Sequence, residues 1–260
     1  MTALEKQIFD RTSLLLGDDV LSCLSSTRVI IFGIGGVGSW CAEGLVRTGI
    51  SRLTIVDSDR VSLSNVNRQL MATTLTEGRP KVEALKERLL SINPDAQIRA
   101  IDSPYTVENA DSFDLSVYDY IIDAIDSLRN KKELIVRAAA QEGATLLSSM
   151  GAALKIDPAR VKIGEFSKVR DCPLGALVRK QLRRERRYPT RKFLCVYGDE
   201  LLENRGHPQG ETELGGWDGA KARINGTTAP VTAIFGMTLA GLVIKDVYHK
   251  ITEKHTENEG

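Results

Sequence analysis

Short apolar runs rich in β-branched residues alternate with segments of helical spacing along the first 150 residues. Such runs, which lack the polar alternation of half-exposed strands, are typical of parallel strands buried on both faces. The pattern predicts strands at residues 28–32, 53–56, 96–101, 117–122 and 144–149, and helices at 37–46, 80–91 and 129–142, with helical turns within 4–24. We therefore expect an α/β domain over residues 1–150, with a Rossmann-like, doubly wound and mostly parallel sheet.

The pattern changes after residue 150. Residues 153–156 and 161–166 predict two antiparallel strands joined by a turn at Asp157-Pro158, and a helix is predicted over residues 173–187. A further strand is predicted at 192–196, a mobile loop at 199–226 and a closing helix at 231–251. We expect residues 151–260 to form a C-terminal α+β extension that contains a basic helix, the mobile loop and the closing helix.

One segment, residues 224–244, carries no charge and has about the length of a membrane span. It contains Asn225, Pro230 and several threonines, so we predict a polar loop and then a helix that packs on the protein core, with no membrane span. The N-terminal residues are charged throughout and lack the apolar stretch of a secretory signal. The four cysteines form no C-x-x-C pair, which favours a reduced, cytoplasmic setting.

A glycine-rich turn follows the first predicted strand. Gly33, Gly35 and Gly38 have the G-x-G-x-x-G spacing, and the second predicted strand ends at Asp57. Glycines let backbone N–H groups at a helix N-terminus approach phosphate, and an aspartate at the end of the next strand accepts hydrogen bonds from ribose. The sequence therefore predicts a nucleotide-binding site.

Charged residues decide which nucleotide chemistry the site favours. Arg68 and Lys81 follow the second predicted strand, and Asp126 follows the fourth, at the sheet edge where ligands of α/β proteins bind. Cations stabilise charge during displacement at phosphorus, and one carboxylate suffices to hold Mg²⁺. Hydride transfer needs neither these cations nor a metal ion. The glycine pattern alone is typical of NAD enzymes, and the alternative for each charged residue taken singly is an ordinary surface position. The chain also lacks a P-loop.

Five ordered motifs within residues 8–155 resemble those of the E1-like, ubiquitin-activating superfamily, whose members adenylate carboxylates with ATP. The motifs are Gly33-Ile34-Gly35-Gly36-Val37-Gly38, Asp57-Ser58-Asp59, Ser64-Asn65-Val66-Asn67-Arg68-Gln69, Pro80-Lys81-Val82-Glu83 and Asp123-Ala124-Ile125-Asp126. The resemblance implies that ATP is bound by Gly33, Gly35, Gly36, Gly38, Asp57, Asp59, Asn65, Arg68 and Lys81. It assigns catalysis to Arg68, Lys81 and Asp126, places Mg²⁺ on Asp126, and implies a homodimer in which Arg11 reaches the partner subunit's ATP.

Within that superfamily the chain is most similar to the tRNA threonylcarbamoyladenosine dehydratase group. The similarity includes Gly151-Ala152, Ile156-Asp157-Pro158 and Cys172-Pro173-Leu174. It implies ATP-dependent cyclisation of N6-threonylcarbamoyladenosine (t6A) at position 37 of tRNA, and a cysteine-desulfurase sulfur-acceptor protein as a further candidate partner. Activation of a small ubiquitin-like sulfur-carrier protein is the alternative activity, and a nucleotide-sensing module or NAD enzyme is a third interpretation.

A basic segment lies within residues 179–192. The whole chain has a net charge of only +1 and thus no global electrostatic signature for nucleic acid, so contact with tRNA depends on local clustering. The predicted tRNA-binding residues are Arg179, Lys180, Arg183, Arg184, Arg186 and Arg187. A solvated helix face paired with acidic residues elsewhere is the alternative interpretation.

Cys172 precedes the predicted basic helix, where a helix dipole lowers a thiol pKa. The cyclisation as written needs no thioester, so we expect Cys172 to have no catalytic role. Cys23, Cys41 and Cys195 are predicted to lie in the core, and His207 is interpreted as a surface residue rather than a base.

Overall fold

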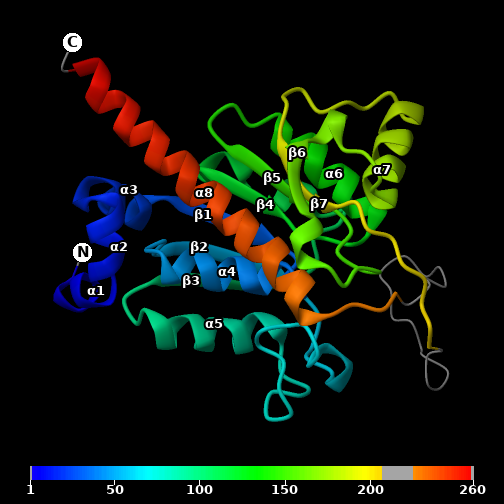
Figure 1. Ribbon diagram of the computed structural model, residues 1–260, viewed down its shortest axis with the longest axis horizontal. Helices are drawn as coiled ribbons and strands as arrows, with labels where there is room; N and C mark the ends of the chain where they lie inside the picture. The colour runs from blue at the N-terminus through cyan, green and yellow to red at the C-terminus, as the bar shows by residue number, and fades with distance from the viewer. Residues whose placement is uncertain (1, 207–224, 259–260) are drawn as a thin grey trace.

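The computed structural model describes residues 2–206 and 225–258, and its centre is one seven-stranded sheet in the order β3-β2-β1-β4-β5-β7-β6 (Figure 1). All neighbouring strands are parallel except β6 and β7, which are antiparallel. The strands are β1 Arg28–Phe32, β2 Arg52–Asp57, β3 Gln97–Asp102, β4 Tyr120–Asp123, β5 Thr145–Ser149, β6 Val161–Glu165 and β7 Leu194–Gly198. The predicted doubly wound α/β fold is confirmed.

Helices cover both faces of the sheet. They are α1 Ala3–Ile8, α2 Asp10–Leu16, α3 Asp18–Ser26, α4 Gly38–Arg47, α5 Lys81–Ile92, α6 Leu128–Ala139, α7 Pro173–Arg184 and α8 Ala229–Asn258. Val29 and Ile31 of β1 belong to the core under α4, α5 and α8, whereas Ile30 and Phe32 belong to the core under α6 and α7. Burial on both faces explains why β1 is a continuous apolar run.

The first half of the chain follows the prediction closely, with shifts of a few residues at the ends of elements. The fourth strand begins three residues late, at Tyr120, because residues 115–117 form a turn of 3₁₀ helix, and α6 ends three residues early, at Ala139. The N-terminal segment forms α1, α2 and α3 rather than one or two isolated turns. The strand β7 extends the main sheet past residue 150, beside β5. A domain division at residue 150 stays a prediction.

The predicted strand at residues 153–156 is wrong. Leu154 has φ of 59°, in the left-handed region that strands do not use. Its N–H donates to the Gly226 carbonyl and its own carbonyl accepts from the Leu202 N–H, both at 2.9 Å. The β6 strand therefore pairs with β7 instead of with this segment. Partners far along the chain override the local strand preference.

The closing helix α8 is longer than predicted and packs on the core as expected. Its buried positions include Val231, Phe235, Leu239 and Val243, which are spaced by four residues and face α4 and the sheet. A Cβ on Gly236 would lie 2.4 Å from the Val37 carbonyl oxygen, so glycine permits this close helix contact. By length and composition α8 is the one described helix that could cross a membrane, and 44% of its apolar window is buried.

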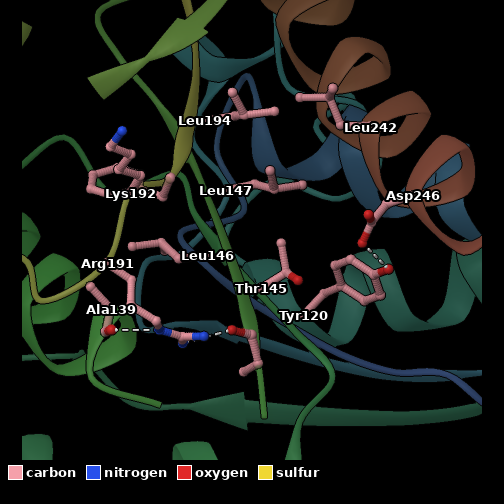
Figure 2. Close-up of a pocket in the computed structure, with 12 residues that line it drawn as sticks. Tyr120, Ala139, Thr145, Leu146, Leu147, Arg191, Lys192, Leu194, Leu242 and Asp246 are labelled. Carbon is pink, nitrogen blue, oxygen red and sulfur yellow. Dashed lines mark hydrogen bonds between the residues drawn. The ribbon is translucent and has the colours of Figure 1, made fainter. Parts of the chain in front are cut away.

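A small cavity lies at the amino-terminal ends of the central strands (Figure 2). The strands β5 and β7 pair only from Leu147 and Leu194 onward, and the space ahead of that point forms a cavity of about 220 Å³. On its α8 side the Tyr120 hydroxyl donates to Asp246 at 2.6 Å. On the other side the Arg191 guanidinium donates to carbonyls that include that of Ala139. The glycine turn lies at the other, carboxyl ends of the parallel strands.

Candidate nucleotide-binding site

A cleft of about 660 Å³ lies at the carboxyl ends of the central parallel strands. This is the position where open α/β sheets bind ligands, beside the point where the strand order reverses. The predicted residues that line it are Gly33, Gly35, Gly36, Asp57, Asp59, Asn65, Arg68, Lys81 and Asp126. Residues from separate stretches of the sequence therefore meet at one site.

The glycines of the turn have two different structural roles. Gly33 has φ of 81°, and a Cβ there would lie 2.7 Å from the Ala124 carbonyl oxygen. A Cβ on Gly38 would lie 1.9 Å from the Gly33 carbonyl oxygen. Gly38 thus lies behind the turn, outside the cleft lining, and lets α4 begin tightly against it. Gly35 and Gly36 line the cleft directly.

The Asp57 carboxylate is held in place by backbone groups on both of its oxygens. The Ile34 N–H and the Asp59 N–H each donate to it at 2.9 Å. Burial raises the pKa of Asp57, while the charge of Lys81 and these two hydrogen bonds act in the opposite direction. Lys81 is buried and its ammonium lies 2.6 Å from the Asp59 carboxylate. The Lys81 ammonium is therefore held at the end of the cleft where Asp57 and Asp59 lie.

Arg68 lies on a tightly hydrogen-bonded loop that lines the cleft. Its guanidinium donates to the Ser64 carbonyl at 2.7 Å, and the Trp40 indole N–H donates to the Arg68 carbonyl at 3.1 Å. Asn65 is buried and accepts from the Ser62 N–H, which closes the turn before Arg68. Burial lowers the pKa of Arg68, and the charge of Asp126 partly offsets this.

The Asp126 side chain also lines the cleft and is exposed. Within the described part of the chain its carboxylate makes no hydrogen bond or ion pair, and its charge acts on the guanidinium of Arg68. Nor do the described residues contain a cluster of three or more His, Cys, Asp or Glu side chains suited to a metal. A single free carboxylate fits Mg²⁺ bound jointly by protein and substrate phosphates, not a metal caged by protein alone.

Two fully buried charges beneath Asp126 were not predicted. The Lys131 ammonium lies 2.8 Å from the Asp123 carboxylate, and both side chains have no solvent exposure. A signal was present in the sequence, because Lys131 shares one helix face with Leu134, Ile135 and Ala138, all of them buried. A lysine on an apolar stripe needs a buried partner.

Three buried side-chain atoms in residues 2–206 and 225–258 have no hydrogen-bond partner. They are the Gln69 Oε1, the Tyr105 hydroxyl and the Thr227 Oγ1, and all three residues line the cleft. An unsatisfied buried polar group is costly, and such groups are rare outside sites that bind ligands or ordered water. Their concentration in this one cleft fits a polar ligand such as a nucleotide, and no sequence pattern indicates them.

Arg11 and the basic segment lie outside the cleft. Arg11 is exposed on α2. The basic helix ends at Arg184 rather than at Arg187. Arg179 donates to the Phe166 carbonyl at 3.0 Å, and Arg187 pairs with Glu133 at 2.7 Å, so structural contacts occupy both. Of the predicted tRNA-binding residues, the exposed ones are Lys180, Arg183, Arg184 and Arg186, here called the basic face.

The cysteines offer no reactive thiol that faces solvent in the described residues. Cys172 is buried at the start of α7, and Cys23 is half-buried against the core. Burial raises the thiol pKa of both Cys41 and Cys195. His207 lies outside the described residues, as does most of the loop predicted to be mobile.

Comparisons with known proteins identify the family of the chain. The ThiF family profile matches residues 9–259. The tRNA threonylcarbamoyladenosine dehydratase of Bacillus subtilis (strain 168) is 35% identical over 256 residues, which are 96% of this chain and 98% of that protein. The Escherichia coli tRNA N6-threonylcarbamoyladenosine dehydratase, solved in complex with ATP, superposes with a TM-score of 0.84 at 31% identity, covering 97% of this chain and 98% of that one.

A second kind of relative matches a smaller part of the chain. The molybdopterin-synthase adenylyltransferase of E. coli (strain K12) is 33% identical over 129 residues, which are 48% of this chain and 51% of that protein. The similarity to the dehydratases instead extends through the segments that follow the nucleotide cleft. The chain therefore belongs to the ThiF family, and within it to the tRNA threonylcarbamoyladenosine dehydratases.

Proposed function

We propose that this chain is an ATP- and Mg²⁺-dependent enzyme that cyclises t6A at position 37 of tRNA, with loss of one water. The observation that carries the proposal is the match to the B. subtilis dehydratase over nearly the whole of both chains. The arrangement of the cleft supports it, because the residues that resemble an adenylation site line one cavity. Activation of a sulfur-carrier protein is the alternative, and its relatives match about half of the chain.

In this proposal the cleft holds ATP along the sheet edge. Asp57 accepts hydrogen bonds from the ribose, and the turn at Gly35 and Gly36 leaves room for phosphates at the N-terminus of α4. Arg68 and Lys81 neutralise the charge that develops on the phosphates. The Asp126 carboxylate would hold Mg²⁺, which supplies charge stabilisation at the phosphate oxygens.

The reaction then needs orientation and charge stabilisation more than a protein nucleophile. A threonyl carboxylate oxygen of t6A attacks the α-phosphorus of ATP, and pyrophosphate leaves. The neighbouring carbamoyl group attacks the activated carbonyl, closes the ring, loses a proton and expels AMP. Because nucleophile and electrophile belong to the same modified base, proximity favours the second step and no cysteine is required. The burial of Cys172 agrees with this scheme.

The basic face is proposed to bind the tRNA backbone. Lys180, Arg183, Arg184 and Arg186 are exposed, and their positive charges lie together at the end of α7. Phosphate contacts of this kind supply affinity without reading sequence. Arg179 and Arg187 have internal partners and are assigned to holding the segment in place.

A homodimer is proposed on the evidence of an apolar groove. The groove runs between α2, α4 and α8 and has a volume of about 480 Å³. Leu14 and Leu15 on α2 are 82% and 79% exposed, and Met237 on α8 is also exposed. Exposed apolar patches of this kind mark protein interfaces. Arg11 lies on the same helix, so a second copy bound here would bring its α2, and this arginine, against the first.

The deciding experiment incubates the purified protein with ATP, Mg²⁺ and t6A-containing tRNA. Nucleosides released by mild digestion are then analysed by mass spectrometry. Loss of one water from t6A that requires ATP is the expected result. Unchanged t6A, together with ATP–pyrophosphate exchange that depends on a protein ending in Gly-Gly, would replace the proposal with the sulfur-carrier alternative. A cytoplasmic setting and a sulfur-acceptor partner stay predictions.

A further inference from the structure

The buried pair of Asp123 and Lys131 requires an explanation beyond stability. Both side chains have no solvent exposure, and their charged atoms are 2.8 Å apart. Removing two charges from water costs several kcal/mol per ion, and the attraction between them often does no more than offset that cost. In other proteins, replacing a buried ion pair by apolar residues of similar volume is often neutral or stabilising. The contacts that the pair makes therefore indicate its role.

Both members of the pair bind the same residue of the loop above them. The Ile125 N–H donates to Asp123 Oδ1 at 3.2 Å, and the Lys131 ammonium donates to the Ile125 carbonyl at 2.9 Å. The second Asp123 oxygen accepts from the Ser148 hydroxyl at 2.6 Å, which ties the carboxylate to β5. Ile125 is thus held at both of its backbone groups, directly before Asp126.

The end of β1 and the first glycine of the turn hold the same loop from the other side. The Ala124 N–H donates to the Phe32 carbonyl at 2.9 Å. A Cβ on Gly33 would meet the Ala124 carbonyl oxygen at 2.7 Å and the Ile125 nitrogen at 3.2 Å. The loop therefore has little freedom to move, although the Asp126 side chain that it carries is exposed and unpaired in the described part of the chain.

We infer that Asp123 and Lys131 are positioning residues that hold the Asp126 carboxylate where it meets the metal-bound phosphates of ATP. They act through the backbone of Ile125 and touch neither nucleotide nor metal. The inference rests on the proposed nucleotide chemistry of the cleft, and it adds a function for two charges that the adenylation scheme does not use. A carboxylate that is already positioned binds Mg²⁺ without the cost of ordering its loop.

A charge-free variant tests this inference. Asp123→Asn combined with Lys131→Met keeps the volumes close to the original and leaves no unpaired buried charge. The asparagine can still accept from the Ile125 N–H, and its amide can donate to the Ser148 hydroxyl, so the variant specifically removes the Lys131 donor to the Ile125 carbonyl. The control is Glu43→Gln with Arg88→Met, which removes the ion pairs that the buried Glu43 of α4 makes with Arg88 of α5 at 2.9 Å and with the exposed Arg47 at 2.7 Å. Neither control residue lines the cleft.

The measurement is calorimetric titration with an ATP analogue whose α and β phosphates are joined by a methylene group, in Mg²⁺ and in EDTA. We expect the charge-free variant to bind about tenfold more weakly than wild type in Mg²⁺, or about 1.4 kcal/mol, and within about twofold of wild type in EDTA. The control should match wild type in both solutions.

An equal decrease of affinity in both solutions would mean that the pair merely holds the fold, and would overturn the inference. Unchanged affinity in Mg²⁺ would overturn it too, as would wild-type binding that does not depend on Mg²⁺. Failure of the proposed function is a separate result, because wild-type protein that leaves t6A unchanged can still show the binding difference. The titration contains no tRNA and measures no turnover.

Discussion

Gln69 allows a test in which stability and ligand binding should change in opposite directions. The side chain is 6% exposed, its Oε1 is buried without a partner in the described part of the chain, and it borders the glycine turn. A buried polar atom left unsatisfied costs about 1–3 kcal/mol. Gln69→Met keeps the length of the side chain and removes that atom, so the free energy of unfolding of the ligand-free protein should rise by up to that amount.

The expected size of the effect follows from the length of the chain. For a domain of this size each kcal/mol shifts the melting temperature by about 2–4 °C, so ligand-free Gln69→Met should melt up to about 12 °C above wild type. The ATP-induced shift should become smaller, because the amide gains its partners when the ligand binds. Differential scanning fluorimetry with and without Mg²⁺ and ATP measures both quantities.

Gln141→Met is the matched control for this test. Gln141 is a half-buried residue whose amide donates to the Arg137 carbonyl at 3.3 Å, outside the cleft. Its replacement should lower stability slightly and leave the ATP-induced shift unchanged. A ligand-free Gln69→Met protein that melts below wild type would refute the reasoning, since the amide would then have stabilised the fold without ligand.

Three further predictions concern charged residues of the cleft and of the basic face. Asp126→Ala should abolish t6A dehydration. It should change the free energy of unfolding by less than about 0.5 kcal/mol, because the side chain is exposed and unpaired in the described part of the chain. Full activity of this variant would exclude Asp126 as the metal ligand. Replacing the four residues of the basic face by glutamates should weaken tRNA binding and make it less dependent on salt. The slope of log K against log salt concentration should decrease by about 0.9 for each phosphate that is no longer neutralised. An unchanged slope would exclude the basic face from the interface. Burial raises the pKa of Asp57, so the folded state binds its proton more tightly than the unfolded state does. The protonated Asp57 therefore contributes to stability below the ordinary aspartate pKa of about 4, and this contribution disappears as the pH rises through the raised pKa of the folded state. The affinity for AMP should increase over the same pH range. Asp57→Asn should remove both trends, as measured by pH-dependent unfolding and calorimetry, and trends that persist would assign them to another group.

The sequence predicts those parts of the structure that depend on local pattern. The run of residues 28–32 is apolar because β1 is buried on both faces, and its bounds match the structure. The residues 153–156 look equally strand-like, but Leu154 takes its conformation from hydrogen bonds to Gly226 and Leu202. Such long-range partners cannot be read from a local window.

The same division holds for the candidate site. Asp57 and Arg68 can be identified from the sequence because their spacing belongs to recognisable motifs, and the structure brings them to one cleft. Lys131 belongs to no recognisable motif. Its place on an apolar helix face predicts only that it has a buried partner, and the structure identifies that partner as Asp123. Gln69 belongs to one of the motifs, but its unpartnered oxygen depends on three-dimensional packing that no sequence pattern encodes.

The close contact between α4 and α8 has a consequence for the order of events during synthesis. α8 follows every other described element along the chain, yet its Gly236 lies against the first turn of α4, and its Thr232 methyl lies 3.2 Å from the position of a Cβ on Gly36. The ribosome therefore makes all seven strands of the described sheet before the helix that covers the nucleotide turn. A nascent chain that ends before residue 229 leaves the apolar face of α4 open to water, and its glycine turn lacks one wall. Competence to bind nucleotide is thus acquired late in translation, after the sheet itself can form.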